Sequence, residues 1–139
     1  MDSHIICRRL AQLAGFLQEL EQLTAGVDEE SYAQNLQVRR AVERQLQLIV
    51  ECATDANAMT LKHLKQAPAS DYFNTFINLA ECGVLPEDFA LQLAASTGLR
   101  NILVHEYQRV DDRIVYQSIS KTLLGYRRYL RLMIEYLDC

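Results

Sequence analysis

Apolar residues recur every three or four positions along most of this chain, and alternating runs of β-branched residues are absent. This spacing puts apolar side chains on one stripe of an α-helix, as in helices that pack on a core. It predicts three long helices, at about residues 3–23, 35–65 and 112–137. The stripes consist of Leu13, Phe16, Leu20 and Leu23, then Val42, Leu46, Ile49, Ala53 and Ala56, and finally Ile119, Leu123, Tyr126, Leu130 and Ile134.

Helix-breaking and helix-capping residues separate these stripes. The stretch TAGVDEES ends the first helix, and Asp28 is a candidate N-cap for a short helical turn. The loop QAPASDY follows the second helix, and Ser70 or Asp71 caps a shorter helix with the sequence DYFNTFINLAEC. Gly83 ends that helix, because glycine adopts the left-handed conformation that often closes a helix.

One more helix precedes the last stripe. Pro86 opens it, at a position where the missing N–H costs nothing, and the sequence PEDFALQLAAS carries it to Gly98. Asp111 is the expected N-cap of the final helix. The sequence therefore predicts an all-α protein, an up-and-down bundle of four to five helices that forms a single domain over residues 1–139.

The charge of the chain limits how it meets nucleic acid. The net charge is −4, which argues against a protein that coats nucleic acid non-specifically but not against a local basic pocket. Most of the basic residues are arginine, which suits bidentate phosphate and carboxylate contacts. The polar face of the second long helix carries Arg39, Arg40, Glu43, Arg44 and Glu51 and is interpreted mainly as a solvated surface. The alternative interpretation is that its arginines form an RNA-backbone track.

The cysteines and the lengths of the apolar runs indicate the cellular compartment of the protein. Cys7, Cys52, Cys82 and Cys139 are widely scattered without metal-binding spacing, so we expect reduced thiols, no zinc site and no disulfide framework. No apolar run approaches the length of a membrane span, and the N-terminal sequence MDSHIICRRL has no secretory h-region. These features predict a cytoplasmic protein with no membrane partner.

In the stretch GLRNILVHEY, residues 98–107, an arginine, an asparagine, a histidine and a tyrosine interrupt an apolar run. On a helix, Asn101 and His105 share one stripe, and Arg100 and Tyr107 share another. Arg100 and His105 lie about 140° apart around an ideal helix. They reach a common point only if the arginine wraps round, if the helix start is distorted, or if a second copy of the chain completes the site.

These residue types suit cleavage of RNA by its own 2′-hydroxyl. A histidine titrates near neutral pH, so His105 can carry the protons, while Arg100 offers donors to the phosphate oxygens. Asn101 is placed to orient either the phosphate or the histidine. No carboxylate cluster resembles a magnesium site, since Asp111 and Asp112 are assigned to helix capping. On spacing alone, a structural role for the histidine remains the commoner explanation.

The wider string resembles the HepT-like toxin family, minimal members of the HEPN superfamily of helical ribonucleases. The family signature is arginine, a polar residue, three further residues, histidine, any residue and tyrosine. Here it is matched by Arg100, Asn101, His105 and Tyr107 without departure. The upstream stretches RRAVERQLQLIVECATDANAM and FINLAECGVLPEDFALQLAASTGLRN are also similar to the family.

The resemblance covers about residues 36–120 and carries expectations of fold, activity and partners. It implies a helical bundle that forms a homodimer and cleaves RNA without metal or cofactor. Arg100 and His105 would be the catalytic pair, with Asn101 assisting. It also implies a type VII-like toxin–antitoxin pair. An MntA-like nucleotidyltransferase antitoxin would transfer AMP from ATP to Tyr107, placing an anionic phosphodiester close to Arg100.

Two other interpretations stay open from the sequence. In one, the chain is a non-catalytic helical binding module that docks a nucleotidyltransferase or a nucleotide. In the other, it is a purely structural bundle in which Arg100 and His105 form internal hydrogen bonds. Glu43 lies in a stretch similar to the family, but the sequence alone suggests no role for it.

Overall fold

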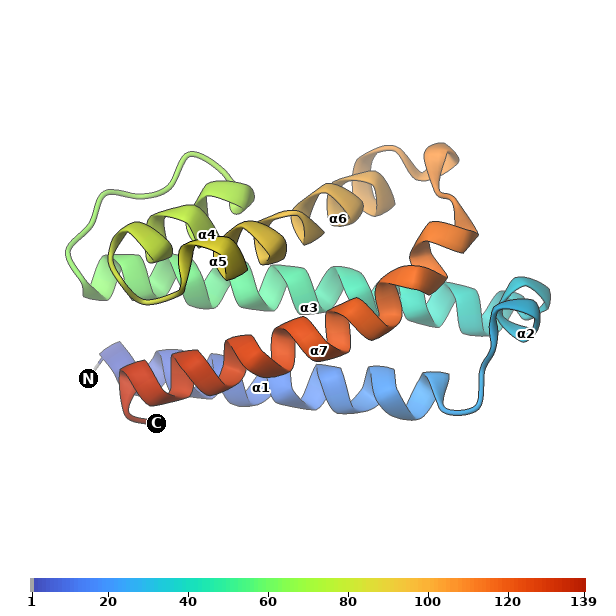
Figure 1. Ribbon diagram of the computed structural model, residues 1–139, viewed down its shortest axis with the longest axis horizontal. Coiled ribbons are helices and arrows are strands. Elements are labelled where there is room, and N and C mark those ends of the chain that lie inside the picture. The colour runs from blue at the N-terminus through green and yellow to red at the C-terminus, as the bar shows by residue number, and fades with distance from the viewer. Residues whose placement is uncertain (1) are drawn as a thin grey trace.

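The computed structural model describes residues 2–139, and every regular element in this range is a helix (Figure 1). The all-α bundle predicted from the sequence is therefore confirmed. In chain order the elements are α1 (Asp2–Thr24), α2 (Glu29–Gln34), α3 (Leu36–His63), α4 (Tyr72–Glu81), α5 (Glu87–Ala94), α6 (Ser96–His105), the 3-10 turn η1 (Tyr107–Arg109) and α7 (Asp112–Leu137).

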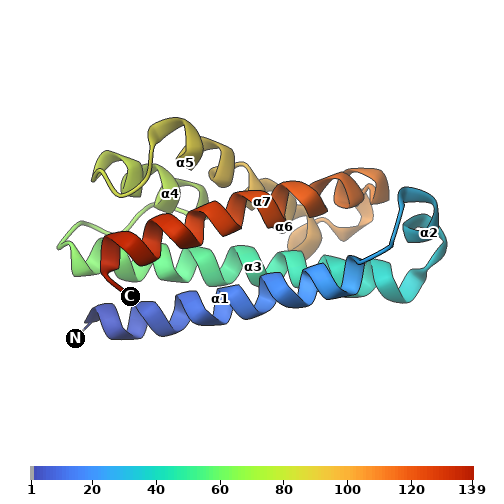
Figure 2. The ribbon, with the colours of Figure 1, turned by 60° about the horizontal axis from the view of Figure 1, so that its bottom comes forward.

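Three long helices, α1, α3 and α7, run side by side along the whole molecule (Figures 1 and 2). Helices α4 and α6 pack against α3, while α5 packs against α4 and leads into α6 (Figure 2). Both termini lie at one end, whereas α2, η1 and the start of α7 lie at the opposite end (Figure 1). The end of α6 and the turn η1 lie toward this second end (Figure 1).

The predicted caps begin the helices where the sequence placed them. Asp28 and Ser31 form a reciprocal capping box at α2, with a distance of 2.8 Å from the Ser31 amide to the Asp28 carboxylate. The carboxylate of Asp71, rather than the hydroxyl of Ser70, caps α4, and that of Asp111 caps α7. Gly83 follows α4 with a φ of 79°, the left-handed conformation expected of a closing glycine.

The apolar stripes form the core with one exception. All five predicted stripe residues of α3 are buried, and Tyr126 and Leu130 of α7 are buried with them. Ile134 was wrongly assigned to the α7 stripe, because it is 41% exposed while Met133 is buried instead. At about 100° per residue, Met133 is about 20° from the direction of Tyr126 and Ile134 about 80°.

The helix expected from Pro86 to Gly98 is interrupted before its predicted end. The helix α5 ends at Ala94, and α6 begins at Ser96 and runs through Gly98. The hydroxyl of Ser96 bonds to the carbonyl oxygen of Leu93 at 2.6 Å and to the hydroxyl of Tyr126 on α7 at 2.7 Å. These contacts hold the junction against α7, and α6 takes a new direction from it (Figure 1).

The prediction of four separate thiols was wrong for one pair. Cys7 near the start of α1 and Cys139 after the end of α7 form a disulfide, with their Cα atoms 5.8 Å apart. The two cysteines are 132 positions apart in the sequence, and only the return of α7 to the start of α1 brings them together. Cys52 and Cys82 are free thiols, as expected.

Within residues 2–139, no helix is both long enough and apolar enough to cross a membrane.

A buried polar cluster joins three helices near the middle of the bundle. The hydroxyl of Tyr129 donates to the side-chain oxygen of Asn57 at 2.5 Å and to the carbonyl oxygen of Ala53 at 3.2 Å. The Asn57 amide donates to the hydroxyl of Thr75 on α4 at 3.1 Å. Since Asn57 and Tyr129 are fully buried, these bonds satisfy groups that water cannot reach.

Tyr129→Phe should therefore destabilise the bundle without removing apolar volume. The change leaves the Asn57 oxygen buried without its donor, so we expect the free energy of unfolding to fall by about 1–3 kcal/mol. Urea denaturation followed by circular dichroism measures this change. Tyr136→Phe, on the exposed part of the same helix, is the matched control. An equal effect of both variants would contradict a special role for the cluster.

Candidate active site

The motif stretch spans the end of α6 and the turn that follows it. His105 is the last residue of α6, and Glu106 leaves the helical conformation with φ −136° and ψ 48°. Tyr107 then begins the 3-10 turn η1. The expectation that Arg100 and Tyr107 share a helical stripe was wrong, because the helix ends between them.

Arg100 is held on three sides. Its Nε and Nη2 atoms donate to one oxygen of Glu51 on α3, at 3.0 and 2.6 Å. Its Nη1 atom donates to the side-chain oxygen of Asn101 at 3.2 Å. Its guanidinium carbon lies 4.9 Å from the ring centroid of Tyr72 on α4, a cation–π contact. The arginine is thus fixed in direction before any ligand arrives.

The contact with Arg100 changes the pKa of Glu51. Partial burial alone would raise the pKa of the Glu51 carboxyl, but hydrogen bonds from Arg100 and Gln47 and the charge of Arg100 lower its pKa below the ordinary value. The carboxylate therefore stays ionised at neutral pH and balances much of the arginine charge. Glu51 leaves two parts of the Arg100 guanidinium for contact with a ligand. These are Nη1, which lies beside Asn101, and the side that lines a cavity.

That cavity is a largely apolar groove of about 740 Å³ between α3, α5, α6 and α7. Arg100 lies on its wall, with Leu46 and Val50 of α3 and Ile114 and Leu124 of α7 among the other lining residues. Ile114 and Leu124 are exposed although they are large and apolar. The arginine thus borders both the polar motif and an apolar surface.

Asn101 and His105 lie on the exposed side of α6, four residues apart, as the sequence predicted. The oxygen of Asn101 accepts a hydrogen bond from Arg100 rather than contacting the histidine. Within residues 2–139, the imidazole of His105 makes no hydrogen bond or ion pair. One chain therefore links Arg100 to Asn101 but does not bring Arg100 and His105 into contact.

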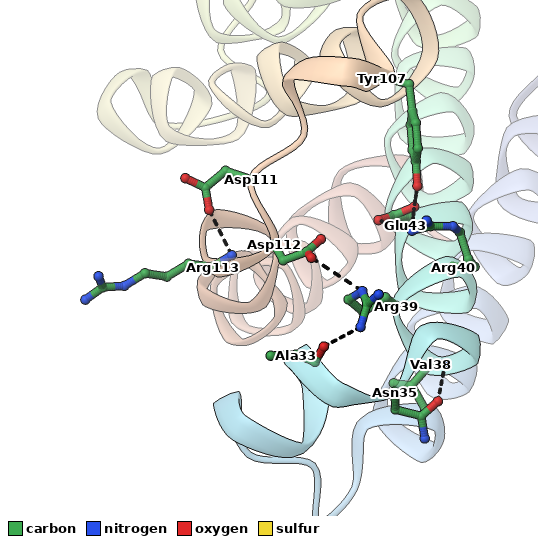
Figure 3. Close-up of polar contacts among 10 residues, drawn as sticks. All are labelled: Ala33, Asn35, Val38, Arg39, Arg40, Glu43, Tyr107, Asp111, Asp112 and Arg113. Carbon is green, nitrogen blue, oxygen red and sulfur yellow. Dashed lines mark hydrogen bonds and ion pairs between the residues drawn. The ribbon is translucent and has the colours of Figure 1, made fainter.

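The side chain of Tyr107 points toward α3 (Figure 3). Its hydroxyl donates a short hydrogen bond to Glu43, a carboxylate that is only 5% exposed. Arg40 pairs with the same carboxylate at 3.3 Å, and its guanidinium carbon lies 5.4 Å from the Tyr107 ring centroid. Desolvation, the hydrogen bond to Glu43 and the negative charge of Glu43 raise the pKa of the Tyr107 phenol above 10.0.

A second ion pair borders this contact. Arg39 lies 3.4 Å from Asp112 at the start of α7, and it also donates to the carbonyl oxygen of Ala33 at the end of α2 (Figure 3). Arg39 therefore joins α2 and α7 to α3, and it does not belong to an unpaired RNA-backbone track. Among the residues that the structure describes, the buried hydroxyl of Tyr32 has no hydrogen-bond partner.

The sequence did not assign the two carboxylates that hold the motif. Glu43 and Glu51 were placed on the polar face of the second long helix, interpreted mainly as solvated, but Glu43 is buried. Their partners Tyr107 and Arg100 lie 64 and 49 positions further along the chain. The weak signal available was an acidic residue directly beside the apolar seam, next to Val42 and Val50.

Metal ligands do not gather at this site or elsewhere in the described chain. Across residues 2–139, no group of three or more histidine, cysteine, aspartate or glutamate side chains is placed to hold a metal ion. The polar groups at the site are an arginine, an asparagine, a histidine and a tyrosine, supported by two carboxylates that are already paired.

A family model described as "Ribonuclease HepT-like" matches residues 13–133 of the chain. The chain belongs to the HepT-like ribonuclease family. The match includes α3 and α6, so it contains both the signature residues and the two carboxylates that contact them. The resemblance stated from the motif is thus confirmed at the level of the family.

Individual relatives agree with this assignment. The chain is 35% identical over 133 residues to the tRNA nuclease HepT of Aphanizomenon flos-aquae, covering 96% of this chain and 90% of the relative. This similarity extends over nearly the whole of both proteins. The relative therefore offers a full-length comparison and not merely a shared motif.

Solved structures show the same fold at lower identity. A toxin–antitoxin crystal structure with AMP-PNP contains a chain with a TM-score of 0.85 and 20% identity, covering 94% of this chain and 97% of that one. A tri-AMPylated HEPN toxin of Shewanella oneidensis, in complex with MNT antitoxin, has a TM-score of 0.84 and 21% identity, covering 93% and 96%. Both matches establish the helical architecture of this chain.

The contact between Arg100 and Glu51 should be measurable as a coupling energy. These side chains are 13% and 28% exposed, so a double-mutant cycle with Arg100→Met and Glu51→Gln should give about 1–2 kcal/mol at pH 7. The pKa of Glu51 is lower in the folded chain than in the unfolded chain. The coupling energy is therefore fully present at pH values above the unfolded pKa of about 4.3, and it is lost as the pH falls through the folded pKa.

The pair Arg127 and Glu21, with side chains 40% and 57% exposed, supplies the control cycle. A solvated ion pair of this kind is expected to give about 0–1 kcal/mol. Urea denaturation of each single and double variant provides the energies. A value for Arg100 and Glu51 no larger than the control would contradict the view that Glu51 fixes the arginine.

Proposed function

We propose that this chain is a ribonuclease toxin of a type VII-like toxin–antitoxin pair, which cleaves RNA without a metal ion or cofactor. The observation that carries the proposal is the state of the signature residues. Glu51 fixes the direction of Arg100, whereas His105 is exposed and makes no hydrogen bond or ion pair within residues 2–139. Membership of the HepT-like ribonuclease family and the similarity to a tRNA nuclease over the whole chain support it.

The chemistry assigned to the site is attack by the RNA on itself. The 2′-oxygen bonds to the adjacent phosphorus while the bond from phosphorus to the 5′-oxygen breaks. His105 carries the protons, because its imidazole is accessible and makes no competing hydrogen bond. Arg100 stabilises the charge that gathers on the phosphate oxygens, and Asn101 assists by holding the Nη1 end of that arginine.

The active form in this proposal is a homodimer in the cytoplasm. Arg100 and His105 of one chain are not in contact, so a second copy offers the simplest way to place both at one phosphate. The exposed side chains of Ile114 and Leu124 support an interface, because they line the apolar groove that reaches Arg100. The cytoplasmic assignment follows from the proposed reactants, RNA and ATP.

The toxin is neutralised, in this proposal, by an MntA-like nucleotidyltransferase antitoxin that transfers AMP to Tyr107. Tyr107 is 42% exposed and lies two residues after His105. The AMPylated state named for the Shewanella oneidensis toxin supports such a modification in a protein of this fold. A phosphodiester on Tyr107 would add negative charge and bulk beside the RNA site.

His105→Ala should abolish cleavage without unfolding the protein. Loss of proton transfer is expected to reduce RNA cleavage at least 100-fold, consistent with the ~10²–10⁴-fold contribution of general acid–base catalysis. Cleavage of total tRNA in the presence of EDTA and growth arrest on induction are the two measurements. His63→Ala, at an exposed histidine of α3, should leave both unchanged.

The binding-module alternative makes the opposite prediction for these assays. If His105→Ala keeps full toxicity while disruption of Tyr107 abolishes it, then catalysis is not the role of the motif. The chain would then act by docking a nucleotidyltransferase or a nucleotide.

Incubation with the cognate antitoxin and ATP should raise the intact mass of the chain by whole AMP units. Peptide mapping should locate the added mass on Tyr107, since its hydroxyl is the nucleophile of the signature. Tyr107→Phe should show no gain, whereas Tyr136→Phe, at a similarly exposed tyrosine, should be modified normally. An unchanged mass of the wild-type chain with an active antitoxin would overturn the proposed mode of neutralisation.

A further inference from the structure

The carboxylate beneath Tyr107 is unusual because it is buried and yet touches the proposed acceptor hydroxyl. Glu43 is 5% exposed and has two partners within residues 2–139, the Tyr107 hydroxyl and the guanidinium of Arg40. Burying an ionised carboxylate costs free energy that a neutral side chain of similar size would avoid. Its position against one particular phenol therefore suggests a chemical role.

We propose that Glu43 is the proton acceptor when Tyr107 is adenylylated. The inference rests on the proposed function, in which Tyr107 receives AMP from ATP, and it adds a catalytic residue supplied by the toxin itself. The phenol oxygen bonds to the α-phosphorus of ATP, and its proton passes to the Glu43 carboxylate. The bond between the α-phosphorus and the bridging oxygen breaks, and pyrophosphate leaves with that electron pair.

The direction of the hydrogen bond makes this transfer geometrically direct. The O–H bond of Tyr107 points at Glu43, so the lone pairs of the phenol oxygen remain available to a phosphorus approaching from the exposed side of the ring. The proton then moves along an existing hydrogen bond as the new bond forms. No rearrangement of the toxin is needed before the attack.

The environment disfavours the alternative of a free phenolate. Desolvation and the neighbouring Glu43 raise the pKa of the Tyr107 phenol, so the ionised form is rarer than in an ordinary tyrosine. Neutral phenol is a poor nucleophile without a base. Removal of the proton during the attack avoids the phenolate, and a base already bonded to the hydroxyl can accomplish it.

Among the described residues, the other acidic group near this hydroxyl is less suited to the task. The carboxylate of Asp112 also raises the pKa of Tyr107 through its charge, so it lies nearby. It pairs with Arg39 and makes no hydrogen bond to the phenol. Glu43 is therefore the carboxylate that can receive the proton directly.

Arg40 completes the arrangement as a positioning residue. It lies beside both the carboxylate and the ring, and its side chain is half exposed, so an incoming phosphate can reach it. Before the transfer it balances Glu43. Once Glu43 holds the proton, the charge of Arg40 is free to pair with the new phosphodiester.

The variant Glu43→Gln distinguishes a role of Glu43 in proton transfer from a role in holding the Tyr107 ring in place. Glutamine keeps the length of the side chain and an oxygen that accepts from the phenol, but it is not a base. With the cognate antitoxin and ATP, we expect the initial rate of mass gain on Tyr107 to fall at least 100-fold, from the ~10²–10⁴-fold range of acid–base catalysis. Glu19→Gln, which alters an exposed hydrogen-bonded glutamate of α1, should retain the wild-type rate.

Chemical rescue provides an independent variant and readout. Glu43→Ala removes the carboxylate and leaves space beside the phenol, so added formate should restore the rate in proportion to its concentration, with no effect on the wild type. A role limited to holding the ring would not be rescued by a small free base. Circular dichroism melts of both variants check that the bundle remains folded.

The outcomes distinguish this inference from the proposed function on which it rests. Modification of Glu43→Gln at the wild-type rate, or loss in Glu43→Ala that formate does not restore, would overturn the role of Glu43 while leaving Tyr107 as the acceptor. Failure of an active antitoxin to modify the wild-type chain would instead overturn the neutralisation proposal. Loss in both variants together with rescue by formate would support Glu43 as the base.

Discussion

The central constraint in this protein is that α3 carries both the core and the supports of the motif. Its seam from Val42 to Ala56 is buried, while Glu43 and Glu51 receive Tyr107 and Arg100 at the edge of that seam. Eight residues along a helix correspond to about 12 Å. The spacing of these two carboxylates sets where the arginine and the phenol of the motif are held, so any shift of α3 would move both.

The electrostatics of the site follow from this arrangement. The chain has a net charge of −4, and the charge of Arg100 is largely balanced by Glu51. In the proposed function, the contact with the RNA phosphate therefore depends on the side of this oriented guanidinium that Glu51 leaves free. Such a site gives local contacts to a phosphate rather than general affinity for nucleic acid.

The helices and most of their boundaries could be predicted because they depend on neighbouring residues. The caps at Asp28, Asp71 and Asp111 bond within three residues of themselves. Ile134 was misassigned because small errors of angle accumulate along a stripe. The break between α5 and α6 was missed because Ser96 reaches Tyr126 on a distant helix. Only the fold brings such partners together.

The sequence by itself determined the helical bundle, the signature of Arg100, Asn101, His105 and Tyr107, and the resemblance to a ribonuclease family. These depend on the order and spacing of residues along one segment. The tertiary structure decided the disulfide of Cys7 with Cys139, the ion pair of Glu51 with Arg100 and the burial of Glu43 beneath Tyr107. The physical reason is that hydrogen bonds act over about 3 Å in space, and helices far apart in the sequence meet at that distance only after packing.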